Sequence, residues 1–447
     1  MRWVFYNLFF AIAYVAMMPQ FLLRMKRRGG YRNRFGDRFG RYPDDVGERL
    51  RRMGGAVWIH AVSVGEVYVA GQVMRALRER VPGLRFVFST TSSTGWIEAG
   101  KQLGPGDVLI YNPLDFPACV KRAVEAVRPK ALILTESEIW PNLIRACHRR
   151  GVPLFLVNAR VSDRSAPGYR RLRYWFGPTL RMFDRIMAQS ESDKRRLADA
   201  GADPEKITVT GSFKFDVANR NPDKERDVAE FLARHDCGPE RLVLLGGSTW
   251  PGEDAVLIAL YQRLCQRYRD VRLVLVPRHF EKADAVQSEI ERKGLACVRK
   301  SREIENAGSP VARDPSQAAA VIVGDTTGEL MGFYGNADIV FVGKSLCEHG
   351  AQNMIEPCLC GAATLVGPNT ENFRPVMSDL LDAEALLQVP DAEALEREIE
   401  RLVADGPVRR ALGARAVEAV MRRKGVVGRC ADSLSARLFS ARGGVRS

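Results

Sequence analysis

Short apolar runs alternate with helical patterns along this chain, and the alternation restricts the fold more than any other feature. Residues 57–62 have the composition of a buried strand, and residues 66–80 repeat apolar side chains at helical spacing. The same pattern predicts strands at 57–62, 84–89, 108–111, 131–135, 153–158 and 186–189, with helices at 66–80, 94–103, 116–127, 141–149 and 168–182. Strands joined through helices of this length form parallel βαβ units.

A second series of the same kind follows a polar, charged stretch at residues 217–239. Its predicted strands are 242–245, 272–276, 320–323, 339–342 and 363–366, and its predicted helices are 253–266, 283–293, 329–335 and 353–360. Because 447 residues exceed what one hydrophobic core usually organises, we expect an α/β protein with two Rossmann-like, doubly wound domains facing a cleft. The expected parts are an N-terminal anchor at 1–28, a first domain at 29–216, a linker at 217–239, a second domain at 240–390 and C-terminal helices at 391–447.

The N-terminal segment, residues 3–23, is dominated by apolar and aromatic side chains and is just long enough to span a bilayer. A strongly basic stretch follows it, which places the rest of the chain in the cytoplasm if the segment is retained as an anchor. Asn7, Pro19 and Gln20 interrupt the apolar run. A helix lying in the membrane interface is therefore the alternative to a helix that spans the membrane.

The formal net charge of +14 comes from 67 Lys and Arg against 53 Asp and Glu, with basic clusters at residues 24–52 and 160–185. Such clusters attract phosphate-bearing partners, and charge alone leaves nucleic acid, anionic lipid and nucleotide open beside a merely solvated surface. Nine cysteines without a CxxC pair indicate neither a zinc site nor a disulfide framework, which favours the cytoplasm. His279 and His349 lack the paired spacing of metal ligands, so we expect no metal site.

The junction WIHAVSVGE, residues 58–66, ends the first predicted strand and begins the first predicted helix. Small residues beside the free N–H groups of a helix N-terminus are typical of a ligand site. Glu66 is either a catalytic carboxylate or the last residue of the capping box Ser63-x-x-Glu66, in which it only satisfies a backbone donor. Spacing alone does not decide between these two interpretations.

Two further stretches of the first domain carry charged side chains just past predicted strands. Glu136, in TESEIWPN, comes before a helix that begins near Pro141, although acidic residues near a helix start also complement its dipole. Residues 158–173 are basic and aromatic, as expected for an anionic, lipid-like acceptor. Lys214, in GSFKFD, is a cation able to stabilise developing negative charge.

Four loops of the second domain follow predicted strands and resemble phosphate or nucleotide contacts. Residues 246–249, GGST, are small enough to cradle a phosphate on backbone N–H groups. Arg278, after Pro277, offers a permanently charged fork. The other two loops open helices; they contain Thr327, Gly328 and Glu329 in GDTTGEL, and Asn353, Met354, Ile355 and Glu356 in NMIEP. Asn353 and Glu356 are either a capping pair or a ribose-binding site.

Seven motifs in order resemble one family, the 3-deoxy-D-manno-octulosonic acid (Kdo) transferases of lipopolysaccharide assembly. They are WIHAVSVGE, TESEIWPN, NARVSDRSA, GSFKFD, VPRHFEKA, GDTTGEL and NMIEP, and they cover residues 58–357. The resemblance implies a GT-B glycosyltransferase of family 30 that moves Kdo from CMP-Kdo to a lipid A precursor (lipid IVA) with inversion. It also implies metal independence, no cofactor, no nucleic acid partner, and an anionic lipid surface at the cytoplasmic face of the inner membrane.

By position in these motifs, the resemblance implies that Glu66 is the general base and that Glu136 and Lys214 stabilise the transition state. It implies that CMP-Kdo is bound by Pro277, Arg278, Thr327, Gly328, Glu329, Asn353, Met354, Ile355 and Glu356. Asp37, Lys344 and His349 depart from the family pattern, which concerns the acceptor site and donor loop. The alternatives are another membrane-associated GT-B transferase that uses a UDP-sugar, and a nonenzymatic nucleotide or anionic-lipid binding protein.

Overall fold

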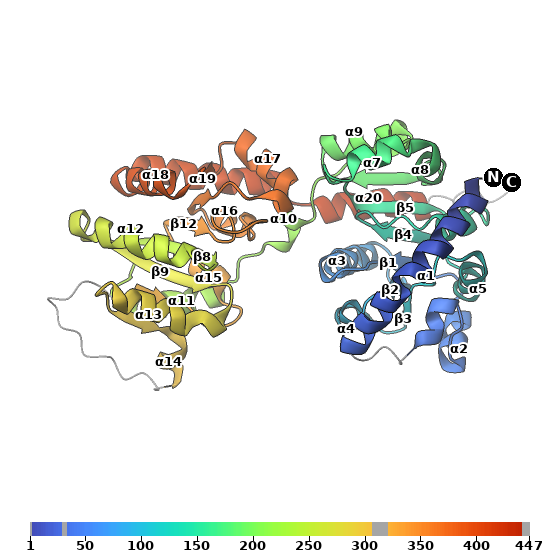
Figure 1. The fold of residues 1–447 in the computed structure, drawn as a ribbon, viewed down its shortest axis with the longest axis horizontal. Coiled ribbons are helices and arrows are strands. Elements are labelled where there is room, and N and C mark those ends of the chain that lie inside the picture. The colour runs from blue at the N-terminus through green and yellow to red at the C-terminus, as the bar shows by residue number, and fades with distance from the viewer. Residues whose placement is uncertain (1, 29–33, 306–320, 440–447) are drawn as a thin grey trace. The chain divides into compact units, whose positions relative to one another are not determined.

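The computed structural model describes residues 2–28, 34–305 and 321–439. The chain divides into two compact units, which are treated separately below. The first unit comprises Met1–Phe213 together with Gly425–Ser447, and the second comprises Lys214–Lys424. Each unit contains one seven-stranded sheet in which every pairing is parallel (Figure 1).

The first sheet has the strand order β3-β2-β1-β4-β5-β6-β7. Its strands are β1 (Val57–His60), β2 (Phe86–Thr90), β3 (Val108–Tyr111), β4 (Ala131–Thr135), β5 (Leu154–Ala159), β6 (Arg185–Ala188) and β7 (Ile207–Val209). Val57 and Ile59 belong to one core cluster and Trp58 to another, so the sheet is buried on both faces, as parallel sheets are. The order reverses between β1 and β4, and the carboxyl ends of these two strands form the topological switch point at which such folds bind ligands.

The helices of the first unit connect these strands. They are α2 (Asp44–Met53), α3 (Val64–Arg80), α4 (Ser93–Gly100), α5 (Pro117–Val127), α6 (Pro141–His148), α7 (Ala166–Arg171), α8 (Arg173–Leu180) and α9 (Glu191–Asp199). The six strands predicted for this region are confirmed. The short strand β7 lacked a long apolar run and was not predicted.

The second sheet has the order β10-β11-β9-β8-β12-β13-β14 and reverses between β8 and β12. Its strands are β8 (Leu242–Thr249), β9 (Val271–Pro277), β10 (Cys297–Arg299), β11 (Val321–Val323), β12 (Ile339–Val342), β13 (Ala363–Val366) and β14 (Leu387–Gln388). Its helices are α10 (Lys214–Val217), α11 (Pro222–Arg234), α12 (Glu253–Arg267), α13 (Ala283–Arg292), α14 (Lys300–Glu305), α15 (Leu330–Tyr334), α16 (Ile355–Leu359), α17 (Arg374–Asp382), α18 (Ala392–Ala404) and α19 (Gly406–Arg423).

The expected linker at residues 217–239 contains a helix of the second unit instead. Helix α11 packs against α15 and buries Val228, Phe231 and Leu232 in the core. Most of its other positions are charged, and this composition concealed a narrow apolar stripe.

The C-terminal helices, expected as one block at 391–447, are divided between the two units. Helices α18 and α19 belong to the second unit, whereas α20 (Val426–Phe439) packs against α3 of the first unit. Figure 1 shows α20, coloured red, beside the strands of the first unit. Arg80 and Asp432 form an ion pair between α3 and α20.

Helix α1 (Arg2–Arg28) lies against the first unit, and its first 19 residues are apolar and long enough to be a candidate membrane span. The Tyr6 hydroxyl donates a hydrogen bond of 2.7 Å to Asp115, and Asn142 donates one of 2.7 Å to Asn7. Phe10 packs edge-on against Phe116. Helix α1 therefore docks at the N-termini of α5 and α6. Much of the predicted basic flank, residues 29–33 included, lies outside the described residues.

The docking of α20 generates a first prediction. Leu434 is fully buried in the core cluster that includes α3. We expect Leu434→Ala to lower the free energy of unfolding by about 2–5 kcal/mol, the usual cost of such a cavity. Chemical denaturation of the purified chain measures this. Leu381→Ala, at an exposed position of α17, is the control, and an equally small effect of both substitutions would contradict the assigned packing of α20.

Candidate active site

Glu66 stands at the switch point of the first sheet, in the first turn of α3. Its carboxylate is largely buried, with 9% of the residue exposed. Oε2 accepts hydrogen bonds from the Val62 amide at 3.0 Å and the Thr135 hydroxyl at 3.2 Å, and Oε1 accepts one from the Ser63 hydroxyl at 2.9 Å. Since each carboxylate oxygen accepts two hydrogen bonds, Oε1 retains the capacity for one more donor.

These contacts show that the capping interpretation of Glu66 is partly correct. The Ser63 hydroxyl accepts a hydrogen bond from the Glu66 amide, which is the N-cap half of a capping box. The reciprocal bond differs, because the Glu66 carboxylate binds the amide of Val62 and not that of Ser63. The contact with Thr135, on β4, is not part of any cap. Glu66 therefore caps α3 and also presents a fixed carboxylate at the switch point.

Glu136 follows β4 directly and has the positive backbone φ of 51° that only a minority of non-glycine residues adopt. Arg160 forms an ion pair of 2.7 Å with its carboxylate, and the Asn158 amide donates to it at 3.3 Å. Asn158 also has a positive φ, 53°. Uncommon backbone conformations at two neighbouring strand ends are typical of functional sites. Because Thr135 binds Glu66, Glu136 follows the strand end that contacts Glu66.

Lys214 is the first residue of the second unit and starts α10. Its ammonium group donates a hydrogen bond of 2.8 Å to the carbonyl of Asn372 and lies 3.8 Å from the ring centroid of Phe373, both in the same unit. The sequence assigned Lys214 to the first domain. Its predicted role beside Glu66 and Glu136 stays a prediction.

Glu356 lies in the first turn of α16, where Asn353 donates a hydrogen bond of 2.9 Å to its Oε1. Asn353 also accepts from the amide of Ile355 at 3.1 Å, but the N-cap of α16 is Met354, so the two side chains form a hydrogen-bonded pair and not the predicted capping box. Burial raises the pKa of Glu356, and the bond from Asn353 and the charge of Arg278 offset this only in part. Arg278 itself is exposed after β9. The charge of Arg278 therefore acts on the Glu356 carboxylate.

The loop before α15 contains the other predicted donor contacts. Thr327 and Gly328 are exposed, and Gly328 has a φ of 81°. Lys300 forms an ion pair of 2.7 Å with Glu329. Burial alone would raise the pKa of Glu329, but the bonds from Lys300 and Thr326 hold it below its usual value. The lowered pKa keeps Glu329 ionised and paired with Lys300.

Met354 and Ile355 are fully buried in the hydrophobic core of the second unit. Their side chains hold α16 in place. Only their backbone groups are suited to a contact with a ligand.

The GGST stretch is a correction to the sequence analysis. Residues 246–249 are the end of strand β8 and not a loop that cradles phosphate. A Cβ on Gly246 would lie 2.5 Å from Leu257, and one on Gly247 would lie 2.6 Å from Tyr334. These glycines are needed for close packing of helices on the strand.

Glu253 holds the loop after β12 at the switch point of the second sheet, and the sequence analysis missed this role. Its side chain is completely buried between the carboxyl ends of β8 and β12. The carboxylate accepts hydrogen bonds from four backbone amides within 3.0 Å, those of Trp250, Lys344, Ser345 and Leu346. The Glu253 carboxylate therefore occupies the backbone N–H groups of the loop that follows β12. The pair Trp250-x-x-Glu253 looks like an ordinary helix start, and spacing gave no signal for its contact with residues 91 to 93 positions further along the chain.

One hollow lies at the carboxyl edge of the second sheet, and another lies at the amino edge of the first sheet. A cavity of about 210 Å³ lies at the carboxyl ends of β8 and β9, and its lining includes Thr249, Asp254 and Pro277. Burial raises the pKa of Asp254 to about 6, against the hydrogen bond from Thr249. Because its lining residues stand at the carboxyl ends of β8 and β9, this hollow lies at the edge of the second sheet where ligands are expected.

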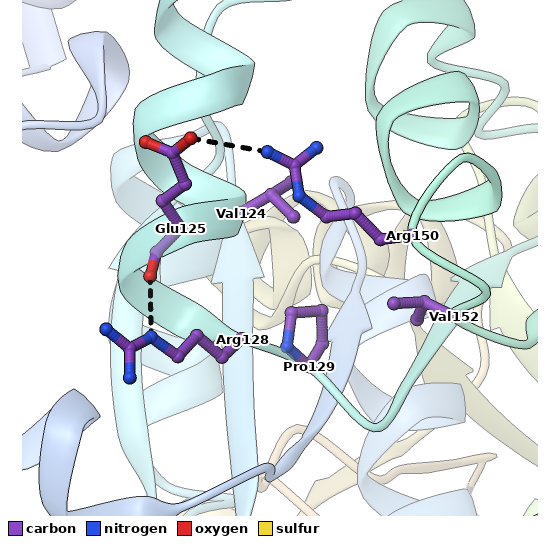
Figure 2. A pocket seen from close by; sticks show the side chains of 6 residues that line it. All are labelled: Val124, Glu125, Arg128, Pro129, Arg150 and Val152. Atoms are coloured by element: carbon purple, nitrogen blue, oxygen red, sulfur yellow. Dashed lines mark hydrogen bonds and ion pairs between the residues drawn. The ribbon is translucent and has the colours of Figure 1, made fainter.

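A second hollow, of about 340 Å³, lies in the first unit and is shown in Figure 2. Pro129 and Val152 precede β4 and β5, so this hollow lies at the amino edge of the sheet, away from Glu66. Glu125 and Arg150 cross it with a partly exposed ion pair. It is not part of the candidate site. Among the described residues, no three His, Cys, Asp or Glu side chains are grouped as a metal site.

Two doubly wound units, each built on a parallel seven-stranded sheet, have the GT-B architecture. In agreement, a solved glycosyltransferase from Rickettsia africae aligns with a TM-score of 0.55 at 13% identity, covering 86% of this chain and 98% of that one. At this identity the likeness concerns the fold.

Sequence comparison gives the family. The family described as "3-Deoxy-D-manno-octulosonic-acid transferase (kdotransferase)" matches residues 33–217. The 3-deoxy-D-manno-octulosonic acid transferase of Bordetella pertussis is 35% identical over 426 residues, 92% of this chain and 94% of the relative. That of Haemophilus influenzae is 33% identical over 405 residues, 90% and 91% of the two chains. The chain belongs to the Kdo transferase family and is a glycosyltransferase.

The contacts of Glu253 generate a second prediction. Glu253→Ala leaves four backbone amides, buried or part-buried, without this acceptor, and each unsatisfied buried group costs about 1–3 kcal/mol. We expect the free energy of unfolding to fall by at least about 3 kcal/mol, measured by chemical denaturation. Glu281→Ala, at an exposed position of the same unit, is the control. Equal stability of the two variants would contradict the assignment.

Proposed function

We propose that this chain transfers Kdo from CMP-Kdo to a lipid A precursor, lipid IVA, in lipopolysaccharide biosynthesis, with inversion and without a metal or another cofactor. The Glu66 carboxylate supports this proposal most directly, because it is fixed at the switch point with room for one more donor on Oε1. Family membership supports Kdo as the transferred sugar.

In the proposed reaction, Glu66 is the general base and Oε1 accepts the proton of the acceptor hydroxyl. The hydroxyl oxygen forms a bond to the anomeric carbon of Kdo as the bond from that carbon to the phosphate oxygen of CMP breaks. Attack on the face opposite the leaving group inverts the configuration. CMP leaves as a phosphate monoester with its charge stabilised by cations and backbone donors.

Glu136 and Lys214 are proposed to stabilise the transition state. Arg160 already neutralises part of the charge on Glu136, which favours a role in positioning groups over proton transfer. For the donor we propose Arg278 at the phosphate and Glu356 at the ribose hydroxyls, with Pro277, Thr327, Gly328, Glu329, Asn353 and the backbone of Met354 and Ile355 around them. The hollow beside Pro277 and the shared environment of Arg278 and Glu356 support this arrangement.

A third prediction tests both the reaction and the base. Purified chain incubated with CMP-Kdo and tetraacylated lipid A precursor is expected to release CMP and form a Kdo-lipid, and a chelator is expected to leave the rate unchanged. Glu66→Gln should lower transfer by at least about 10²-fold, the range for loss of a general base. Mass spectrometry of the lipid measures the product.

Ser63→Ala is the matched control for this prediction. It removes the N-cap and one donor to Oε1, at a cost of about 1 kcal/mol in stability, and keeps the carboxylate with its bonds from Val62 and Thr135. Activity of Glu66→Gln within a few-fold of the parent would contradict the base assignment. Transfer from a UDP-sugar in place of CMP-Kdo would contradict the donor, and CMP binding without any transfer would indicate a nonenzymatic binding protein.

We also propose that α1 holds the chain on the cytoplasmic face of the inner membrane by lying in the interface. Tyr6, Asn7 and Phe10 bind the first unit, and a helix crossing the bilayer would lose these contacts. The outward positions of α1 are exposed and apolar; they are Val4, Phe5, Leu8, Phe9, Ile12 and Val15. Next to them, Trp175 of α8 packs on Phe5.

The segment of residues 160–175, which α1 contacts through Phe5 and Trp175, has the charge expected for an anionic lipid surface. Exposed arginines occur at positions 160, 164, 170, 171 and 173. Exposed Tyr174 and Trp175 accompany them, as aromatic residues do at membrane interfaces. An in-plane helix with basic neighbours is the usual arrangement of an interfacial anchor.

A fourth prediction tests the membrane proposal. Phe9→Asp with Ile12→Asp should weaken binding to anionic phospholipid vesicles by at least about tenfold, because burial of one such side chain contributes about 1.5–3 kcal/mol. Vesicle sedimentation measures this, and Met421→Asp, at an exposed position of α19, is the control. An N-terminal tag should be cleaved by protease added to inverted inner-membrane vesicles. Protection of the tag would contradict the in-plane arrangement in favour of a spanning helix.

A further inference from the structure

Lys344 is the second residue after β12, at the switch point of the second sheet, and the proposed reaction assigns no role to its side chain. Its backbone φ of 59° lies in the left-handed region, where glycine is the least strained residue. Ser248, near the end of the neighbouring strand β8, has a φ of 53°. Uncommon backbone conformations at the adjoining strand ends of a switch point are typical of functional sites.

The backbone of Lys344 is held on both sides. Its amide donates a hydrogen bond of 2.8 Å to Oε2 of Glu253, and its carbonyl accepts one of 2.8 Å from the amide of Ala351. The amide of Trp250 donates to the same Oε2 of Glu253 at 2.9 Å. One buried carboxylate oxygen therefore sets the positions of Lys344 and Trp250 relative to each other.

The side chain of Lys344 lies on the indole of Trp250, with Nζ 4.7 Å from the ring centroid. Attraction between a cation and the face of an aromatic ring holds the ammonium group in place without neutralising its charge. Within the described part of the chain, the Lys344 side chain forms neither an ion pair nor a hydrogen bond. Because the residue is partly exposed, the N–H donors of its ammonium group remain available to an anionic ligand.

The Trp250 ring connects this ammonium group to the hollow of the second unit. It meets the ring of His279 edge-on at 5.4 Å, and His279 lines the hollow of about 210 Å³ at the carboxyl ends of β8 and β9. Strand β8 pairs with β9 on one side and with β12 on the other, so Arg278, after β9, and Lys344, after β12, flank the strand end that leads to Trp250. Both cations thus follow strands at the edge of the sheet where ligands bind in such folds.

The proposed donor carries two anionic groups, the phosphate that joins CMP to the sugar and the carboxylate of the sugar acid. The carboxylate is attached to the anomeric carbon, next to the bond that breaks. Arg278, proposed at the phosphate, supplies one positive charge for this pair of anions. A second ammonium group at the neighbouring strand end is suited to either anion, because lysine binds phosphate and carboxylate as a point charge.

We propose that Lys344 is a donor-binding residue whose ammonium group pairs with an anionic group of CMP-Kdo, either its phosphate or its sugar carboxylate. This inference rests on the proposed function for the identity of the donor. The Glu253 carboxylate fixes the backbone of Lys344, and the Trp250 ring fixes its ammonium group. A cation that is already ordered loses little freedom on binding, and it therefore binds an anion more tightly than a mobile surface lysine does.

Lys344→Gly is the decisive variant, because it removes the cation and introduces the residue that this backbone conformation favours. The midpoint of chemical denaturation is expected to stay equal or to rise. The affinity of the full chain for CMP-Kdo, measured by isothermal titration calorimetry, is expected to fall about tenfold to a hundredfold, the range for loss of a charged contact. Lys344→Arg keeps the charge and should lose less affinity. Lys293→Gln, at the exposed end of α13 and the opposite edge of the sheet, controls for loss of charge alone.

Titration with free CMP distinguishes the two anionic groups. Equal weakening of CMP and CMP-Kdo binding in Lys344→Gly assigns Lys344 to the phosphate, and weakening of CMP-Kdo binding alone assigns it to the sugar carboxylate. Unchanged affinity for both, with or without a fall in stability, would overturn the inference and leave Kdo transfer by the parent chain unaffected. Weakened binding as expected, in a chain that transfers no Kdo, would instead count against the proposed function and leave Lys344 as a binding residue.

Discussion

The hydroxyl of Thr135 makes the contact on which the candidate site depends. It lies at the end of β4, and its single proton is shared between the carbonyl of His60 and the carboxylate of Glu66. Parallel strands β1 and β4 are neighbours only because the chain reverses its strand order there. The hydroxyl therefore fixes the Glu66 carboxylate at the point where the strand order reverses. Glu136 follows directly at the same strand end.

The two sheets use carboxylates at their switch points in opposite ways. In the first unit, Glu66 is held by three donors and keeps an oxygen with room for a ligand. In the second unit, Glu253 is held by at least four backbone amides and is fully buried. The first arrangement suits proton transfer, and the second fixes a loop by supplying the negative charge that its N–H groups need. A donor phosphate must then find its contacts elsewhere, for which Arg278 is suited.

Most strands of the two sheets could be predicted from the sequence, because strands buried on both faces are continuous apolar runs. The short edge strands β7, β10 and β14 were not predicted. Helix α11 could not, since three buried apolar residues carry its packing among many charges. The carboxyl end of β8 was also missed, because glycines required for close packing look like loop residues. For Glu66, spacing showed a possible cap but not the contact with Thr135, which is 69 positions away in the sequence. Long-range contacts of this kind decide function and leave no local pattern.

In the proposed function, the position of α1 would link the membrane to the chemistry. Asp115, which receives the Tyr6 hydroxyl, also accepts two amides at the start of α6. That helix begins directly after the loop that contains Glu136 and Glu138. A helix in the membrane plane would thus lie at the same edge of the sheet as Glu66, where a lipid acceptor could present a hydroxyl while its acyl chains stay in the bilayer. A spanning helix would have to abandon Asp115, whose carboxylate would then be left buried with one donor fewer. The hydrogen-bond geometry therefore favours an in-plane anchor, and this arrangement suits a reaction on a substrate that does not leave the membrane.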